Sequence, residues 1–166
     1  MPAVRDRVVE AAVLGWLRPR VEPALSDAVF GYRPGRSVSG AQGRLLTLAE
    51  GDRPVAVRAD VARCFSSVSH ARVLAALDRL DVPAGLVTLV AALLGAPSEG
   101  AAREPGRGLP LGSALSPTLS NLALDPLDRA LEAAGLPHVR YGDDVAAAVR
   151  TLGEGRESVS RGLKIQ

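Results

Sequence analysis

The chain has 166 residues, 47% of them hydrophobic, and a formal net charge of +2, which excludes a disordered chain and predicts a single domain over residues 1–166. Its apolar runs are too short to span a bilayer, so we expect a cytoplasmic protein without a membrane partner. Aromatic residues make up 3% of the chain, which argues against single-strand binding by base stacking. Cys64 is the one cysteine, which excludes an internal disulfide.

The first predicted element is a helix over residues 2–17. Apolar residues recur on one broad face of it, and Val8 and Val9 belong to that face. Pro19 is expected to close this helix, because proline disrupts a helix interior.

A loop over residues 30–37 follows, in which glycine and proline restrict the backbone and Arg33 and Arg36 protrude. Ser37 is placed to cap a helix over residues 38–50. Arginine forks beside the unpaired N–H groups of a helix start suit a phosphate, although ordinary solvated arginines explain the same residues.

The middle of the chain begins with a strand over residues 55–60, because apolar residues alternate there and the run ends in the carboxylate of Asp60. An acid at a strand end is well placed to bind a metal. Helices are expected from Ser69 or His70 to Leu80 and over residues 84–94. We interpret His70 as a helix-start residue and residues 95–108 as a flexible hairpin.

Residues 108–121 form a glycine-bounded loop that enters a long helix reaching about Ala134. Small residues in this loop let another backbone or a nucleotide approach closely. Asp128 and Arg129, near the end of the helix, are expected on a solvated face. Residues 151–161 are too short and too rich in glycine for a good helix, and residues 162–166 are expected to form a strand.

Two adjacent carboxylates, Asp143 and Asp144, stand between short apolar runs. Gly142 and Asp143 at the centre predict a hairpin whose tight turn carries the acids. Burying adjacent like charges is costly unless a cation lies between them, and Mg²⁺ prefers carboxylate oxygens. Simple turn chemistry is the alternative explanation for an Asp-Asp pair in a hairpin.

The order of these stretches resembles the order of motifs in the palm of template-dependent polymerases. In the residues of its motifs the chain resembles reverse transcriptases of the bacterial group II intron and retron kind. The matching stretches lie at residues 4–9, 30–37, 59–65, 108–128 and 141–144. The resemblance implies an α+β fold, with a small antiparallel sheet backed by helices. It further implies partial fingers over residues 1–50 and an incomplete palm over residues 51–166, without a thumb.

The resemblance implies a metal site. It makes Asp60 and Asp143 the metal-binding acids, with Asp144 supporting them and the backbone carbonyl of Val61 completing the set. Two Mg²⁺ ions would bind there, with Mn²⁺ as an alternative. Such a pair stabilises both the attacking and the leaving oxygen of a displacement and needs carboxylates from separate strands.

The resemblance also implies a nucleotide site. Phe65 would lie under the sugar and exclude a ribose 2′-hydroxyl, whereas an ordinary core aromatic is the alternative. Arg33 and Arg36 match the fingers loop, where a basic residue neutralises the incoming triphosphate. Arg33 is favoured for this contact, and Arg36 either shares it or supports the fold. Leu111 and Gly112 match the loop that supports the nucleotide and template, although many relatives have glutamine where Leu111 stands.

The implied activity is RNA-directed DNA synthesis from dNTPs on an RNA template with a DNA or RNA primer. Further N- and C-terminal parts, or a partner chain, would complete such an enzyme. A non-catalytic remnant that binds nucleic acid or a partner chain is the second hypothesis. An RNA-dependent RNA polymerase or a nucleotidyl cyclase is a third, which Phe65 and the Arg33 loop disfavour.

Overall fold

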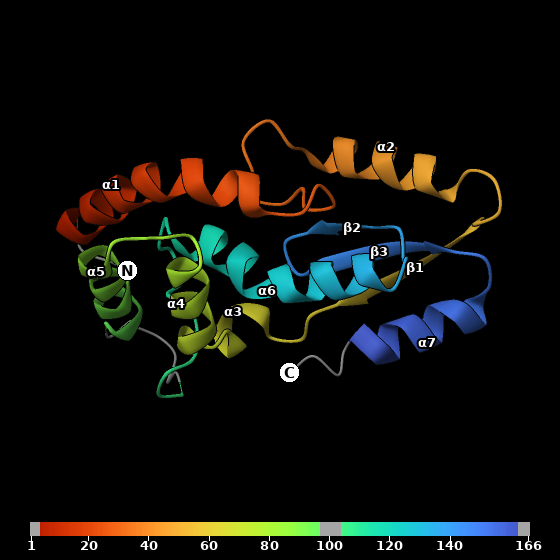
Figure 1. Cartoon of the computed structure of the whole chain (residues 1–166). Helices are drawn as coiled ribbons and strands as arrows, with labels where there is room; N and C mark the ends of the chain where they lie inside the picture. The colour runs from red at the N-terminus through yellow and green to blue at the C-terminus, as the bar shows by residue number, and fades with distance from the viewer. Residues whose placement is uncertain (1–3, 97–103, 163–166) are drawn as a thin grey trace. The chain divides into compact units, whose positions relative to one another are not determined.

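A three-stranded antiparallel sheet and a set of helices make up the computed structural model, which describes residues 4–96 and 104–162 (Figure 1). This arrangement confirms the predicted α+β fold. The elements in chain order are α1 (Val4–Val21), η1 (Glu22–Ala24), α2 (Val38–Ala49), β1 (Val55–Asp60), α3 (Cys64–Ser67), α4 (His70–Asp78), α5 (Ala84–Gly95), α6 (Ser116–Ala133), β2 (His138–Tyr141), β3 (Asp144–Val149) and α7 (Leu152–Gly162).

The chain divides into two compact units. The helical unit comprises residues 1–25 and 63–123, and the sheet unit comprises residues 26–62 and 124–166. Helix α6 therefore begins in the helical unit and ends in the sheet unit.

Strand β3 is the centre of the sheet, whose strand order is β1-β3-β2. The β1–β3 register pairs Val55 with Val149 at one end and Asp60 with Asp144 at the other. Strands β2 and β3 form the predicted hairpin, in which Tyr141 pairs with Asp144. The sequence predicted β1 and the hairpin correctly, because alternation of apolar residues is a local signal of a half-buried strand.

The two faces of the sheet are covered differently. Helix α2 packs on β2 and β3 and buries a cluster of Phe30, Ala41 and Val139. A second cluster on the other face is formed by Leu131, Leu136, Val145, Ala147 and Val149. Helix α7 packs on β1 and β3, and Figure 1 shows α2 and α7 on opposite sides of the sheet.

The prediction that residues 151–161 would not form a good helix is wrong, because they form most of α7. Thr151 Oγ1 accepts a hydrogen bond from the Glu154 backbone N–H (3.2 Å), and the Glu154 carboxylate accepts one from the Arg150 N–H (2.9 Å). Thr151 thus caps the helix start, and the Glu154 side chain reaches back one residue beyond the cap, in an arrangement related to a capping box. A Cβ at Gly155 would lie 2.4 Å from Val57 Cγ2, so this glycine lets the helix approach the sheet.

Helix α1 differs from its prediction in two respects. It continues through Pro19 to Val21, because burial of Leu17 and Val21, both 0% exposed, stabilises its last turn. Val8 and Val9 do not belong to the buried face, since they are 66% and 39% exposed.

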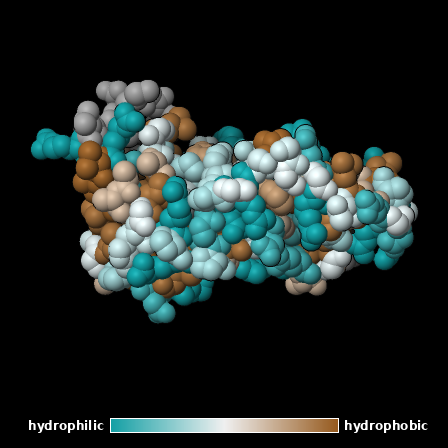
Figure 2. Space-filling model, turned by 90° about the horizontal axis from the view of Figure 1, so that it is seen from above, coloured by the Kyte–Doolittle hydropathy of each residue, from teal (hydrophilic) through white to brown (hydrophobic). Residues whose placement is uncertain are grey.

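Hydrophobic side chains lie among hydrophilic ones on the face of the molecule seen in Figure 2.

The remaining helix predictions agree with the structure within a few residues. Helix α2 has Ser37 as its cap, since Ser37 Oγ accepts a hydrogen bond from the Gly40 N–H at 3.1 Å. Helix α4 begins at His70, as expected. Residues 97–103 of the hairpin expected over residues 95–108, and residues 163–166 of the strand expected over residues 162–166, lie outside the described residues. Across the described ranges, no helix has the length and apolar character needed to cross a membrane.

Candidate active site

The predicted acids meet at one end of the sheet. Asp60 ends β1, Asp144 begins β3, and the two residues are direct partners in the antiparallel register. Side chains of such partners project from the same face of a sheet. Asp143 occupies the turn immediately before Asp144. Asp60 is exposed and the other two acids are half-buried, so solvent reaches all of them.

The hairpin turn consists of Gly142 and Asp143. Gly142 has a φ of 68°, and Asp143 is not among the non-glycine residues with positive φ in the described part of the chain. Positive φ at the first central position is the pattern of a type II′ turn, which favours glycine there. The Val61 N–H donates a hydrogen bond to the Asp143 carbonyl oxygen at 3.1 Å, which ties the turn to the residue after β1.

Arg58 neutralises one of the acids. Its Nε and Nη2 donate to the two carboxylate oxygens of Asp144 at 2.9 and 2.7 Å. The hydrogen bond and the charge of Asp144 raise the pKa of Arg58. Asp60 and Asp143 form no ion pair within the described residues. Asp144 is therefore held by the protein itself, which suits a supporting rather than a leading role.

The donor set has the chemistry that Mg²⁺ requires. The candidate donors are carboxylates and the Val61 carbonyl, all of them oxygen, and their exposure leaves room for water or substrate oxygens. No three acidic, histidine or cysteine side chains converge on a preformed ion site within the described ranges. The residues fit the ion by chemistry and by the pairing of Asp60 with Asp144.

The two predicted triphosphate ligands make contacts with their own loop. Arg33 Nη1 donates to the carbonyl oxygens of Ser26 (2.8 Å) and Val29 (3.2 Å). Arg36 pairs with Asp27 at 2.7 Å, and its guanidinium lies 5.0 Å from the centroid of the Phe30 ring. The hydrogen bond and charge of Arg36 lower the pKa of Asp27. Their role toward a triphosphate stays a prediction.

The same loop lies against the acidic turn. The backbone of Arg140 exchanges hydrogen bonds with Phe30 (2.7 Å) and Ala28 (2.8 Å), which aligns this segment with β2. A Cβ at Gly31 would lie only 2.2 Å from the Gly142 nitrogen. The sequence suggested a phosphate loop here, and the structure adds that Gly31 permits close backbone contact with the turn that carries Asp143.

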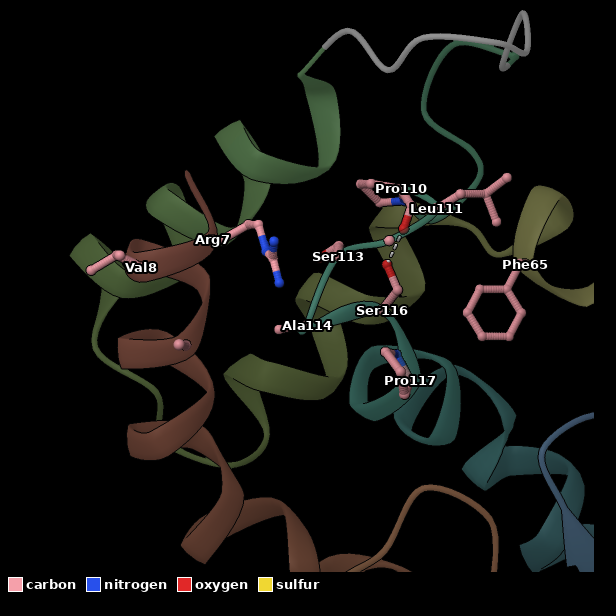
Figure 3. Close-up of a pocket in the computed structure, with 11 residues that line it drawn as sticks. Arg7, Val8, Phe65, Pro110, Leu111, Ser113, Ala114, Ser116 and Pro117 are labelled. Carbon is pink, nitrogen blue, oxygen red and sulfur yellow. Dashed lines mark hydrogen bonds between the residues drawn. The ribbon is translucent and has the colours of Figure 1, made fainter. Parts of the chain in front are cut away.

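A cavity of about 710 Å³ in the helical unit contains three of the predicted nucleotide-site residues (Figure 3). Phe65 of α3 lines it together with Leu111 and Gly112. Leu111 is 71% exposed, so its side chain is not part of a core. The volume is in the range of small-molecule sites in proteins.

Residue Arg7 of α1 also lines this cavity, and sequence reasoning assigned it no role. Figure 3 shows its side chain extending from α1 toward the segment that carries Ser113 and Ala114. Arg7 is exposed and forms no ion pair in the described part of the chain. A guanidinium in such a position suits a phosphate. The signal in the sequence was that Arg7 lies within residues 4–9, one of the stretches that resemble reverse transcriptases.

The loop along this cavity is held by hydrogen bonds from three sides. The Glu10 carboxylate, in a residue only 3% exposed, accepts one from the Ala114 N–H at 2.9 Å. Ser116 Oγ donates to the Pro110 carbonyl at 2.7 Å. The Leu109 N–H donates to the Phe65 carbonyl at 2.6 Å, which connects this loop to α3.

The prediction that Asp128 and Arg129 share a solvated face is wrong for Asp128. The Arg129 side chain is 52% exposed, whereas Asp128 is 0% exposed and forms an ion pair with buried Arg140. Burial by itself would raise the pKa of Asp128, but the neighbouring His138 ring and the hydrogen bonds and charge of Arg140 outweigh it and lower that pKa. A one-residue step along a helix turns a side chain by about 100°, so neighbours differ in burial.

The fold is that of a polymerase palm, because solved structures that superpose on this chain include those of a Cas6-RT-Cas1–Cas2 complex and of telomerase. A chain of a partial Cas6-RT-Cas1–Cas2 complex superposes with a TM-score of 0.54 at 25% identity, over 99% of this chain and 30% of that chain. Telomerase from Candida albicans, in complex with a fragment of telomeric RNA, superposes with a TM-score of 0.60 at 11% identity, over 96% of this chain and 32% of that chain.

The family model for reverse transcriptase (RNA-dependent DNA polymerase) matches residues 1–164, and the chain belongs to this family. Protein YkfC of Escherichia coli strain K12 is 31% identical over 147 residues, which are 85% of this chain and 37% of YkfC. An uncharacterised 91 kDa protein in the cob intron of Schizosaccharomyces pombe is 30% identical over 130 residues, 77% of this chain and 16% of that protein. The resemblance predicted from the motifs is confirmed.

Proposed function

We propose that this chain is the fingers and palm core of an RNA-directed DNA polymerase, with fingers over residues 1–50 and palm over residues 51–166. The observation that carries the proposal is the register of Asp60 with Asp144, because it gathers Asp60, Asp143 and Asp144 at one end of the sheet. Membership of the reverse transcriptase family supports the reaction class. The substrates are dNTPs, an RNA template and a DNA or RNA primer.

The reaction transfers a nucleotidyl group. The primer 3′ oxygen attacks the α-phosphorus of the dNTP and loses its proton to solvent, while the bond from the α-phosphorus to the bridging oxygen breaks and pyrophosphate leaves. Two Mg²⁺ ions, or Mn²⁺, supply Lewis-acid stabilisation of the attacking and leaving oxygens when bound. Asp60 and Asp143 would hold the ions, the Val61 carbonyl would add a ligand, and Asp144 would support them from its ion pair with Arg58.

In this proposal, residues of the helical unit and of the loop over residues 30–37 contact the nucleotide. Phe65 underlies the sugar, and Leu111 with Gly112 supports the base and template in the cavity of about 710 Å³. Arg33 and Arg36 neutralise the triphosphate, which requires their guanidinium groups to exchange the present partners for phosphate oxygens. Forked donors make this exchange favourable, because they bind phosphate in the same bidentate way as carboxylate.

Primer extension on an RNA template, with dNTPs and Mg²⁺ or Mn²⁺, tests the proposal. We expect extension that depends on both the divalent ion and the template. The chain extended by its genomic downstream sequence is the companion sample. If neither protein extends a primer, the polymerase proposal is wrong, and retention of a labelled primer–template by the chain would then favour nucleic-acid binding without catalysis.

Replacing Phe65 by alanine or valine is expected to relax discrimination against ribonucleotides. The large ring leaves no room for a 2′-hydroxyl, and loss of such a steric contact changes selectivity by about 10–200-fold. The measurement is the ratio of kcat/KM for dNTP and rNTP incorporation. Val8→Ala, at another residue lining the cavity, is the control that removes apolar area without affecting the sugar. An unchanged ratio in both Phe65 variants would contradict the assigned role.

A further inference from the structure

The largest fully buried side chain of the sheet unit is an arginine. Arg140 and Asp128 are both 0% exposed. Arg140 Nε donates to the two Asp128 carboxylate oxygens at 2.9 and 3.1 Å, and Nη2 donates to Oδ2 at 2.7 Å. This is a forked ion pair between β2 and α6, on the face of the sheet opposite α2.

The same guanidinium has a further hydrogen bond that reaches the acidic turn. Arg140 Nη1 donates to the Gly142 carbonyl oxygen at 2.8 Å. That carbonyl belongs to the peptide group that joins Gly142 to Asp143, so its direction sets the orientation of the Asp143 backbone. Glycine has the widest backbone freedom of all residues, and the turn therefore needs an external restraint at this peptide.

Histidine 138 completes the buried cluster from the same face of β2. Its Nδ1 donates to the Leu136 carbonyl at 3.1 Å, since a carbonyl can only accept, and its Nε2 lies 3.5 Å from Asp128 Oδ1. Asp128 thus faces Arg140 and His138, while Arg140 spans from Asp128 to the turn. A buried ion pair of this kind adds little net stability compared with apolar residues of similar volume. We therefore look for the role of the Asp128–Arg140 pair in the group that Arg140 orients, the Gly142 carbonyl.

We propose that Arg140, held in place by Asp128, is a positioning residue that fixes the Gly142–Asp143 peptide and thereby directs the Asp143 carboxylate. The expected effect on kcat rests on the proposed function. The expected effect on the order of the turn rests on the hydrogen bonds alone. The Val61 N–H, which donates to the Asp143 carbonyl at 3.1 Å, reports the order of the same turn.

The test replaces both members of the pair, Asp128→Leu with Arg140→Met, so that no buried charge is left unpaired. The double variant is expected to fold, because apolar replacement of a buried pair is often neutral or stabilising. We expect amide exchange at Val61 to accelerate by about tenfold or more, relative to the Ala148 amide. That amide bonds to Pro137 at 2.9 Å near the far end of the sheet and reports global opening. In primer extension, kcat should fall by about 10–100-fold while KM for dNTP changes less than threefold.

Arg140→Lys is the second variant, and it carries the test if the double variant does not fold. Lysine keeps the positive charge for Asp128 but lacks the fork that also reaches Gly142, so the same two readouts should change. Arg150→Lys is the matched control, because it makes the same exchange in an ion pair with Asp52 (2.7 Å) in the same unit, at the end of the sheet opposite the acidic turn. It should leave Val61 exchange and kcat unchanged.

The outcomes separate the two proposals. If Val61 exchange and kcat are both unchanged in a folded variant, the positioning role is wrong. If the unaltered chain shows no polymerase activity, the proposed function fails, while accelerated Val61 exchange in the variants would still establish that the pair orders the turn.

Discussion

Replacing Asp60 or Asp143 by asparagine should reduce primer extension by about three orders of magnitude or more. A neutral amide is a poor ligand for a divalent cation, and loss of stabilisation of the transition-state charge by about 4 kcal/mol corresponds to a thousandfold in rate. The measurement is single-turnover extension on an RNA template at saturating dNTP. Retained extension in both variants would remove the two-metal mechanism.

The same substitutions are expected to leave the fold intact. Asp60 is exposed and directly opposite Asp144 in the sheet, where like charges repel, so removing a carboxylate should not lower the melting temperature. Asp52→Asn is the control, because Asp52 is an exposed acid that pairs with Arg150 at 2.7 Å outside the site. It should extend primers at the unaltered rate.

Replacing Gly31 by alanine should destabilise the sheet unit and disturb the acidic turn. The added Cβ would lie 2.2 Å from the Gly142 nitrogen and 2.9 Å from the Tyr141 carbonyl carbon, and backbone atoms cannot rotate away as a side chain can. Such overpacking costs about 1–3 kcal/mol, and each kcal/mol lowers the melting temperature of a chain of this size by about 2–4 °C. Thermal unfolding and primer extension should both decline.

Gly43→Ala is the matched control for this steric argument. Gly43 lies within α2, is exposed, and has nothing within 4 Å of the position that a Cβ would take. Alanine is favoured over glycine in a helix by about 1 kcal/mol, so this variant should gain stability. A Gly31→Ala protein as stable and as active as the Gly43→Ala protein would contradict the close packing of the loop on the turn.

Local patterns in the sequence were sufficient for much of the fold. The alternation of residues 55–60 predicted β1 with its correct ends, and Ser37 predicted the start of α2. The Gly-Asp centre of residues 141–144 predicted the hairpin. In each case the deciding interaction lies within a few residues along the chain, so the sequence carries the signal in one place.

The candidate site was predictable in part. Asp60 and Asp143 were selected as acids at a strand end and a turn, and the register confirms that Asp60 and the hairpin lie together. Their role as metal ligands stays a prediction. Arg33 and Arg36 were predicted as protruding arginines, but each has partners in its own loop, which depend on how residues 26–30 fold back.

Within this chain, the sequence by itself determined the order of the candidate site residues and most of the elements that carry them. Tertiary structure alone decided which polar residues are buried and which glycines are contact points. Asp128 looked solvated until α6 packed it against Arg140 of β2, and Gly31 and Gly155 have no local signature that distinguishes them from turn glycines. The physical reason is that burial and steric contact depend on residues far apart in the chain, whereas helix caps, strand alternation and turns depend on neighbours.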